Sequence, residues 1–172
     1  MDFSIRMASI DDASCIARVH VDTWRETYSG IVPSSYLEQL NYESREQRWR
    51  TIFAESGVID KTIVAFDPNG AIAGFASIGA GRDFGLEHAG EIFAIYVYKR
   101  HHGLGVGRKL LQDSFDLLSA AGFHEFYLWV LKANPARAFY LQMGGTESEE
   151  KTIDIAGTPL KEIRMDWRSK GP

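Results

Sequence analysis

The chain has 172 residues, 45% of them hydrophobic, which is enough apolar material for one domain with its own core. Lys and Arg total 19 against 23 for Asp and Glu, so the formal net charge is -4. Because phosphate-backbone binders normally carry a strong positive excess, we expect no binding to nucleic acid. The only cysteine, Cys15, excludes an intrachain disulfide framework and a cysteine-based zinc site. Its helical surroundings predict a small core residue.

The N-terminal segment carries charges at Asp2 and Arg6 and has no long apolar run. We therefore expect neither a signal peptide nor a transmembrane helix. A cytoplasmic protein that contacts no membrane is the default expectation.

The first third of the chain is predicted to be mostly helical. Residues 3–9 are typical of a short strand that ends at Ser9, a good helix N-cap. Residues 10–30 have acidic residues in the first turn and helical apolar spacing, and they end on a glycine. Two further helical pieces are expected at 32–40 and 44–55.

The pattern changes to strands after residue 60. Residues 61–66 and 71–80 flank Asn69-Gly70, a pair that favours the left-handed geometry of tight turns, so they predict a β-hairpin. Residues 91–97 are apolar on both faces, which is typical of a central strand.

The rest of the chain alternates helices and strands. Apolar residues repeat at helical spacing from Leu110 to about Gly122, and further elements are predicted as a strand at 125–131, a short helix within 134–145, and a hairpin of 151–157 with 160–167. No repeat or linker interrupts the sequence. The expected fold is one α/β domain over residues 1–172, with a mixed, mostly antiparallel central sheet flanked by helices.

Three glycines at 103, 105 and 107 lie between the central strand and the following helix. A dinucleotide-binding G-x-G-x-x-G pattern would need glycine at Arg108 or Leu110, and no P-loop string occurs. The remaining phosphate-binding motif is a strand followed by a glycine-rich turn and a helix N-terminus, whose unpaired N–H groups can bind an anion. Close packing of the helix on the sheet is the alternative explanation.

Residues 97–107 follow the spacing V-x-x-x-x-[QR]-x-x-G-x-[GA], with His102 where Gln or Arg is usual. In this they resemble the pyrophosphate-binding signature of the GNAT superfamily, the acetyl-CoA-dependent N-acetyltransferases. A second register, starting from Arg100, matches only the latter half of the signature. Val97 and Leu110 favour the register on His102.

A second segment supports the resemblance. Residues 134–145 are similar to the family's N-x-x-A-x-x-F-Y-x-x-x-G-F, although one residue fewer separates Asn134 from Phe139-Tyr140. Gly145 also stands where Phe is common. The two signatures are separated by the expected helix and strand, so together they are far more specific than either alone.

The resemblance implies acetyl-CoA as cosubstrate. The strand at 91–97 would splay from its neighbour near Val97 and hold the pantetheine arm, the Val97 N–H would help to polarise the thioester carbonyl, and the glycine loop would cradle the pyrophosphate. His102 would donate mainly through its backbone N–H, and Asn134 would bond the cofactor arm. The cofactor-binding residues expected on this basis are Ile95, Tyr96, Val97, His102, Gly103, Leu104, Gly105, Val106, Gly107, Arg108, Asn134 and Tyr140.

Two residues are predicted to carry the chemistry. The resemblance places Tyr140 near the sulfur of coenzyme A, where a hydroxyl with an ordinary pKa of about 10 keeps its proton and can act as a general acid. Glu91 opens an otherwise apolar strand and could take a proton from the acceptor amine. The alternative for Glu91 is a solvated strand end.

Trp24 and Tyr28 belong to the N-terminal helices that border the acceptor pocket in this family, so both are expected to bind the acceptor. No metal is expected, because the adjacent His101 and His102 lack a third ligand. The acceptor is predicted to be a primary amine of a small molecule. A protein N-terminus or lysine, and a non-catalytic acyl-CoA sensor, are the alternatives. The resemblance also implies a homodimer.

Overall fold

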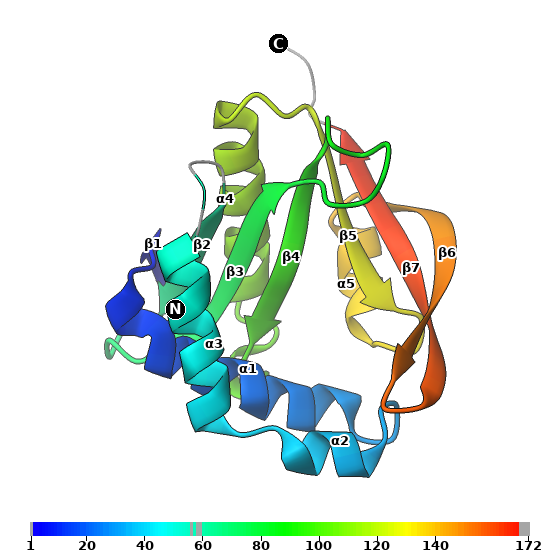
Figure 1. The fold of residues 1–172 in the computed structure, drawn as a ribbon. Helices are drawn as coiled ribbons and strands as arrows, with labels where there is room; N and C mark the ends of the chain where they lie inside the picture. Colours follow the sequence, from blue (N-terminus) through cyan, green and yellow to red (C-terminus); the bar gives the residue numbers. More distant parts are fainter. Residues whose placement is uncertain (1, 56, 58–59, 169–172) are drawn as a thin grey trace.

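The computed structural model describes residues 2–55, 57 and 60–168. Its elements follow the expected order (Figure 1): β1 (Ser4–Met7), α1 (Ala13–Tyr28), α2 (Ser34–Gln39), α3 (Tyr42–Glu55), β2 (Lys61–Phe66), β3 (Ile72–Ala80), β4 (Gly90–Val97), α4 (Val106–Ala120), β5 (Glu125–Leu131), α5 (Ala136–Gln142), β6 (Thr146–Ile155) and β7 (Thr158–Arg168). Single turns of 3-10 helix precede α1 (Ile10–Asp12) and α4 (Lys99–His101).

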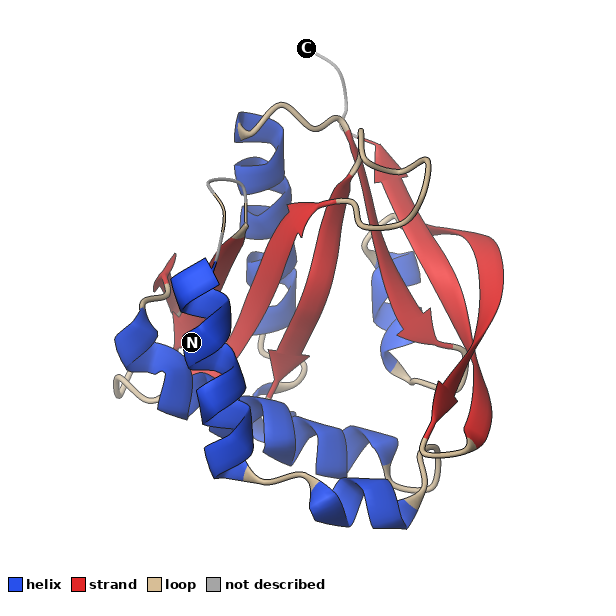
Figure 2. Ribbon diagram, in the orientation of Figure 1, coloured by secondary structure: helices blue, strands red, loops and turns tan. Residues whose placement is uncertain are grey.

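The strands form one sheet in the order β1-β2-β3-β4-β5-β7-β6 (Figure 2). All neighbours are antiparallel except β4 and β5, which confirms the mixed, mostly antiparallel sheet. β4 and β5 pair only through Gly90 with Phe126 and Glu91 with Tyr127. The splay expected near Val97 therefore begins much earlier, directly after Glu91.

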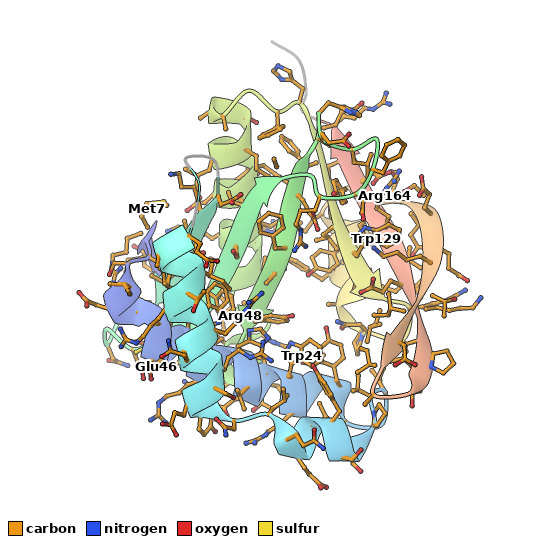
Figure 3. The ribbon with its side chains drawn as sticks, viewed as in Figure 1. Met7, Trp24, Glu46, Arg48, Trp129 and Arg164 are labelled. Carbon is orange, nitrogen blue, oxygen red and sulfur yellow. The ribbon has the colours of Figure 1, made fainter. Side chains whose placement is uncertain are left out.

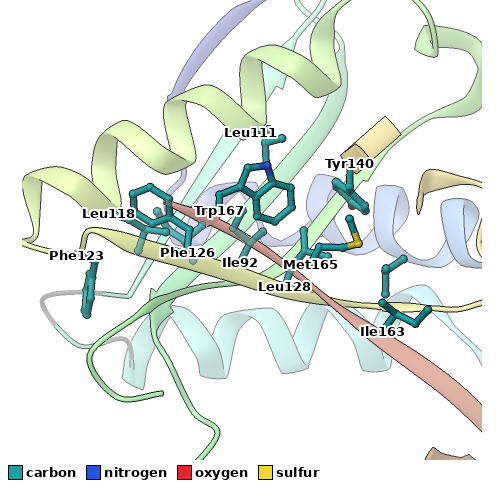
Figure 4. Packing of buried hydrophobic residues seen from close by; sticks show 12 residues of the cluster. Ile92, Leu111, Leu118, Phe123, Phe126, Leu128, Tyr140, Ile163, Met165 and Trp167 are labelled. Atoms are coloured by element: carbon teal, nitrogen blue, oxygen red, sulfur yellow. The ribbon is translucent and has the colours of Figure 1, made fainter. Parts of the chain in front are cut away.

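Helices cover both faces of the sheet, as predicted. One face of β2 and β3 packs on α1 and α3 through Ile16, Val19 and Trp49. The other face packs on α4 through Val106 and Leu110. Around β5 and β7, a third cluster brings Leu111, Leu118, Tyr140, Met165 and Trp167 together under α4 and α5 (Figure 4).

Some details differ from the sequence-based expectations. Cys15 is exposed and not a core residue, because Ala13, Ile16 and Ala17 form the inward face of α1. The last hairpin begins at Thr146 and not at Lys151. Residues 146–150 are exposed on this edge strand, so no alternation of apolar residues marks them as β structure.

Across residues 2–55, 57 and 60–168, no helix has both the length and the apolarity to cross a bilayer.

Candidate functional site

The end of β4 offers free backbone groups to the gap beside β5. The Tyr98 N–H donates to the Ala73 carbonyl at 3.0 Å. Because hydrogen-bonded and non-bonded pairs alternate along an antiparallel ladder, the amides of Val97 and Ile95 point away from β3, toward the gap. The amide of Tyr96 points to β3 instead. Its backbone is thus directed away from the expected cofactor position, and its side chain faces α1.

The glycine loop presents unpaired donors at the start of α4. Gly103 (φ 75°) and Gly105 (φ 87°) adopt the left-handed backbone that glycine alone tolerates readily. Among the described residues, no acceptor meets the backbone N–H groups of Gly103, Gly105, Val106, Gly107 and Arg108. They lie at the positive end of a 15-residue helix. This arrangement fits a phosphate-bearing anion.

His102 contributes differently from what the sequence suggested. Its backbone N–H donates to the Lys99 carbonyl at 3.0 Å, so it is already used within the 3-10 turn. Its exposed ring lies with Nε2 2.9 Å from the Val97 carbonyl oxygen. The side chain thereby ties the loop to the end of β4, five residues earlier. Leu104 is similar, because its N–H makes a 3.4 Å bond to the His101 carbonyl.

The basic side chains of this segment have different surroundings. Arg100 stacks on the Tyr98 ring, with its guanidinium carbon 4.0 Å from the ring centroid. Lys109 donates to the Phe3 carbonyl at 2.6 Å and so anchors the N-terminus. Arg108 is exposed beside the unpaired N–H groups. Of the three, Arg108 is the residue left to add charge to the anion site.

Tyr140 reaches from α5 into the core cluster. Its side chain is 6% exposed and lies 6.1 Å from the Trp167 ring (Figure 4). Burial, with a smaller effect of Tyr96, raises the pKa of the Tyr140 hydroxyl above its ordinary value. No described residue hydrogen-bonds this hydroxyl. Tyr140 therefore keeps its proton at neutral pH, and its O–H group is available to donate a hydrogen bond.

Asn134 is buried and already has two partners. Its Oδ1 accepts the Ala136 N–H at 2.8 Å, which caps the start of α5. Its Nδ2 donates to the Tyr28 hydroxyl at 3.2 Å. Asn134 thus joins α1 to α5, and one amide hydrogen remains for the expected contact with the cofactor arm.

Gly145 departs from the family pattern for a visible reason. A Cβ atom there would lie 2.7 Å from the Trp167 indole and 3.0 Å from the Tyr140 carbonyl oxygen. The indole from β7 occupies the room that a phenylalanine at this position would need.

Glu91 is neither a solvated strand end nor a free carboxylate. It is 4% exposed and accepts from Arg82 at 2.7 Å and 3.0 Å and from the Tyr127 hydroxyl at 2.9 Å. The Arg82 backbone N–H adds a further bond at 3.0 Å. These bonds hold the loop between β3 and β4 against β5. The predicted role of Glu91 as a base stays a prediction.

Trp24 and Tyr28, the expected acceptor residues, lie together on α1 with ring centroids 4.6 Å apart. Trp24 also contacts Tyr36, at 5.9 Å. Burial raises the pKa of Tyr96, and the nearby Trp24 N–H opposes this effect, although it makes no hydrogen bond among the described residues. In Figure 3, Trp24 and Arg48 lie on the helical side of the gap, and Trp129 and Arg164 lie on the β5–β7 side.

Two charged residues near these rings were not predicted from the sequence. Arg45 on α3 and Glu162 on β7 both act electrostatically on Tyr96. Side chains alternate between the two faces of the strand at 160–167, so Glu162 lies on the face opposite to the buried Ile163 and Met165. The sequence pattern does not show which of the two faces is turned toward Tyr96.

Within the described ranges, no group of three His, Cys, Asp or Glu residues is placed to hold a metal ion. His101 is buried with its ring edge-on to Phe3, whereas His102 is exposed and contacts Val97. The two imidazoles thus have separate structural partners.

Known proteins resemble this chain along most of its length. The model of a family described as the acetyltransferase (GNAT) family matches residues 20–144. An uncharacterized N-acetyltransferase, YuaI, of Bacillus subtilis (strain 168) is 37% identical over 164 residues, which cover 95% of this chain and 92% of that protein. A spermidine N(1)-acetyltransferase of Thermoplasma acidophilum is 23% identical over 147 residues (84% and 88%). An L-amino acid N-acyltransferase, MnaT, of Escherichia coli (strain K12) is 35% identical over 75 residues, 43% of each chain.

The fold also has solved counterparts. The crystal structure of the PaiA N-acetyltransferase from Thermoplasma acidophilum in complex with coenzyme A superposes with a TM-score of 0.74 at 20% identity. The superposition covers 98% of this chain and 99% of that one. The likeness shows that the two chains share a fold.

Proposed function

Because this chain belongs to the acetyltransferase (GNAT) family, whose named relatives are N-acetyltransferases, we propose that it transfers the acetyl group of acetyl-CoA directly to a primary amine of a small molecule. The proposed reaction takes place in a ternary complex of enzyme, acetyl-CoA and amine. The homodimer and the cytoplasmic location expected from the sequence stay predictions.

The observation that carries this proposal is the pairing of a free strand edge with a free helix N-terminus. β4 has no partner on the β5 side beyond Glu91, and the loop that follows presents unpaired N–H groups. Extended polyamide chains bind to such strand edges through main-chain hydrogen bonds. An anion binds at a helix start through its N–H groups. A pantetheine arm that ends in a pyrophosphate fits both features, with the arm along β4 and the pyrophosphate at the start of α4.

Acetyl-CoA, when bound, supplies an acetyl group activated as a thioester, whose C–S bond breaks as the C–N bond to the acceptor forms. The Val97 N–H points into the gap, where it can stabilise negative charge that develops on the carbonyl oxygen. Tyr140 donates its hydroxyl proton to the departing sulfur, for which its raised pKa keeps it protonated. A base must remove a proton from the ammonium form of the acceptor before attack, and Glu91 remains the predicted residue, directly or through water.

The acceptor side is consistent with a small amine. Trp24, Tyr36 and Tyr96 are partly exposed, and Tyr28 is buried behind them. The relatives named for spermidine and for L-amino acids use small acceptors that differ in charge, a polycation and a zwitterion.

The test is Tyr140→Phe, assayed by release of free thiol with a panel of amines. We expect a loss in kcat of ~100-fold, the usual range for removing a general acid, with the affinity for coenzyme A unchanged. Phe139→Leu, a neighbouring substitution on α5, controls for effects of altered packing. Unchanged turnover would remove Tyr140 from the acid role. Thiol release only with peptide acceptors would reassign the acceptor to protein.

A further inference from the structure

Near the partly exposed rings on the acceptor side lie two opposite charges, Glu162 and Arg45, whose side chains make no hydrogen bond with any described residue. The rings form a continuous series: Tyr36 contacts Trp24, Trp24 stacks on His20 at 6.0 Å, and His20 lies 5.0 Å from Tyr96. This aromatic series, defined as His20, Trp24, Tyr36 and Tyr96, runs from α2 to the end of β4. What lies at each side of it determines which acceptor fits.

On the sheet side lies Glu162. It pairs with Leu131 at the C-terminal end of β5, so it lies at the wide end of the splay, across from Tyr96. Its side chain is 18% exposed, and its nearest cation, Lys151, is 3.9 Å away. Lys151 is shared with Asp83, at 3.7 Å, and its side-chain nitrogen lies 3.8 Å from the centroid of the Trp129 ring.

The Glu162 carboxylate therefore has few hydrogen-bond donors around it. No described side chain hydrogen-bonds it, and burial raises its pKa, an effect that Lys151 opposes and Asp83 and Glu91 reinforce. Its negative charge raises the pKa of both Tyr28 and Tyr96, although burial is the larger cause for each. A half-buried carboxylate in this position can be satisfied by an ammonium group.

On the helical side lies Arg45. It is partly buried on α3 and makes no side-chain hydrogen bond or ion pair with any described residue. With Tyr36 and Arg48 it lines a hollow of about 250 Å³ between α2 and α3. Its positive charge lowers the pKa of Tyr96, against the larger effect of burial. A guanidinium without a partner is suited to a carboxylate.

We propose that the acceptor is an amino acid, whose ammonium group is bound by Glu162 and whose carboxylate is bound by Arg45, with its side chain against the aromatic series. The proposal rests on the proposed function and adds the charge class of the acceptor. An amino acid would supply the hydrogen bonds that both groups lack among the described residues, since Glu162 has only its 3.9 Å ion pair with Lys151 and Arg45 has no side-chain partner there. A polycation would satisfy Glu162 and meet repulsion from Arg45.

The experiment compares leucine with two analogues that lack its carboxylate, leucinamide and isoamylamine, and with the polycation spermidine. Leucine, leucinamide, isoamylamine and spermidine are assayed by initial rates of thiol release with the wild-type chain. Because the amine of leucinamide is less basic, more of it is uncharged at neutral pH, which biases the assay against our expectation. We expect kcat/KM for leucine to exceed that for leucinamide by ~10-fold or more, since a charge-assisted contact is lost in the amide.

The matched variants are Arg45→Met and Arg50→Met. Both remove one positive charge from α3, but Arg50 pairs with Glu46 and does not line the hollow. We expect Arg45→Met to raise KM for leucine ~10-fold with little change in kcat and no change for leucinamide. We expect Arg50→Met to leave both acceptors unaffected. Glu162→Gln should raise KM for every amine, because it acts on the ammonium group that all of them share.

Two failures are distinguishable. Absence of thiol release with every amine would overturn the proposed function. Thiol release that prefers leucinamide or spermidine, or an equal effect of Arg45→Met on leucine and leucinamide, would overturn the amino acid and leave the acetyl transfer intact. Affinity for coenzyme A and thermal unfolding of each variant show that the fold and the cofactor side are preserved.

Discussion

The two sides of the candidate site are built from different materials. The cofactor side consists mainly of backbone: unpaired N–H groups at the start of α4 and the free edge of β4. The acceptor side consists of side chains from α1, α2, α3, β4 and β7. A backbone site requires particular residues at fixed spacing, whereas a side-chain site can be assembled from positions far apart in sequence. Substitutions should therefore separate the two sides.

Among substitutions that act on binding or stability, the largest effect is expected on the cofactor side, at Gly105. An alanine in its left-handed conformation costs about 1–3 kcal/mol, which the loop can relieve only by turning its N–H donors away. We expect Gly105→Ala to weaken coenzyme A binding by ~10-fold or more, measured by calorimetry. The control is Gly107→Ala, whose Cβ would make an ordinary 3.5 Å contact with Phe139. Equal losses in the two variants would contradict a conformational role for Gly105.

A smaller effect is expected where the two sides meet, at Glu91. Glu91→Gln removes one charge from its pair with Arg82, whose side chain is 65% exposed. Because Arg82 remains solvated, we expect the free energy of unfolding to fall by only about 1–2 kcal/mol, measured by urea denaturation.

The same variant tests the predicted base role. If Glu91 accepts the proton, turnover falls mainly at lower pH, where the amine is hardest to deprotonate. Arg82→Met breaks the same ion pair and leaves the buried carboxylate without its cation, so it should lower stability and, if Glu91 is the base, move the acid limb of the pH profile to higher pH. A uniform loss of rate across pH in Glu91→Gln would exclude the base role.

The smallest effect is expected within the aromatic series, at His20. Burial, and to a lesser extent Arg45, lowers the pKa of His20 to about 3. The unfolded chain takes up this proton near its ordinary pKa of about 6.5, so stability is lost as the pH falls below that value. We expect the free energy of unfolding to be about 1 kcal/mol lower at pH 5.5 than at pH 6.5. His20→Phe should flatten this slope and leave coenzyme A affinity unchanged; an unaltered slope would assign it to other groups.

The same contrast explains what could be predicted from sequence. The order of elements followed from apolar periodicity, and the position of the anion site followed from glycines spaced against Val97 and Leu110. The partners of Glu91 could not be predicted, because Arg82 reaches it only through the path of an irregular loop. Arg45 and Glu162 lie 117 positions apart in the chain. Only the folded sheet and helices bring their charges to either side of Tyr96.

The short ladder between β4 and β5 has a mechanical meaning. Two residue pairs join a four-stranded half-sheet, β1 to β4, to a three-stranded one, β5 to β7. These pairs lie at one end of both strands, and Val97 and Leu131 lie at the other, unpaired end. A small rotation of one half-sheet about Gly90 and Glu91 therefore changes the distance between the unpaired ends far more than the distance at the paired ends. The width of the opening depends on how firmly Arg82 and Tyr127 hold Glu91 in place.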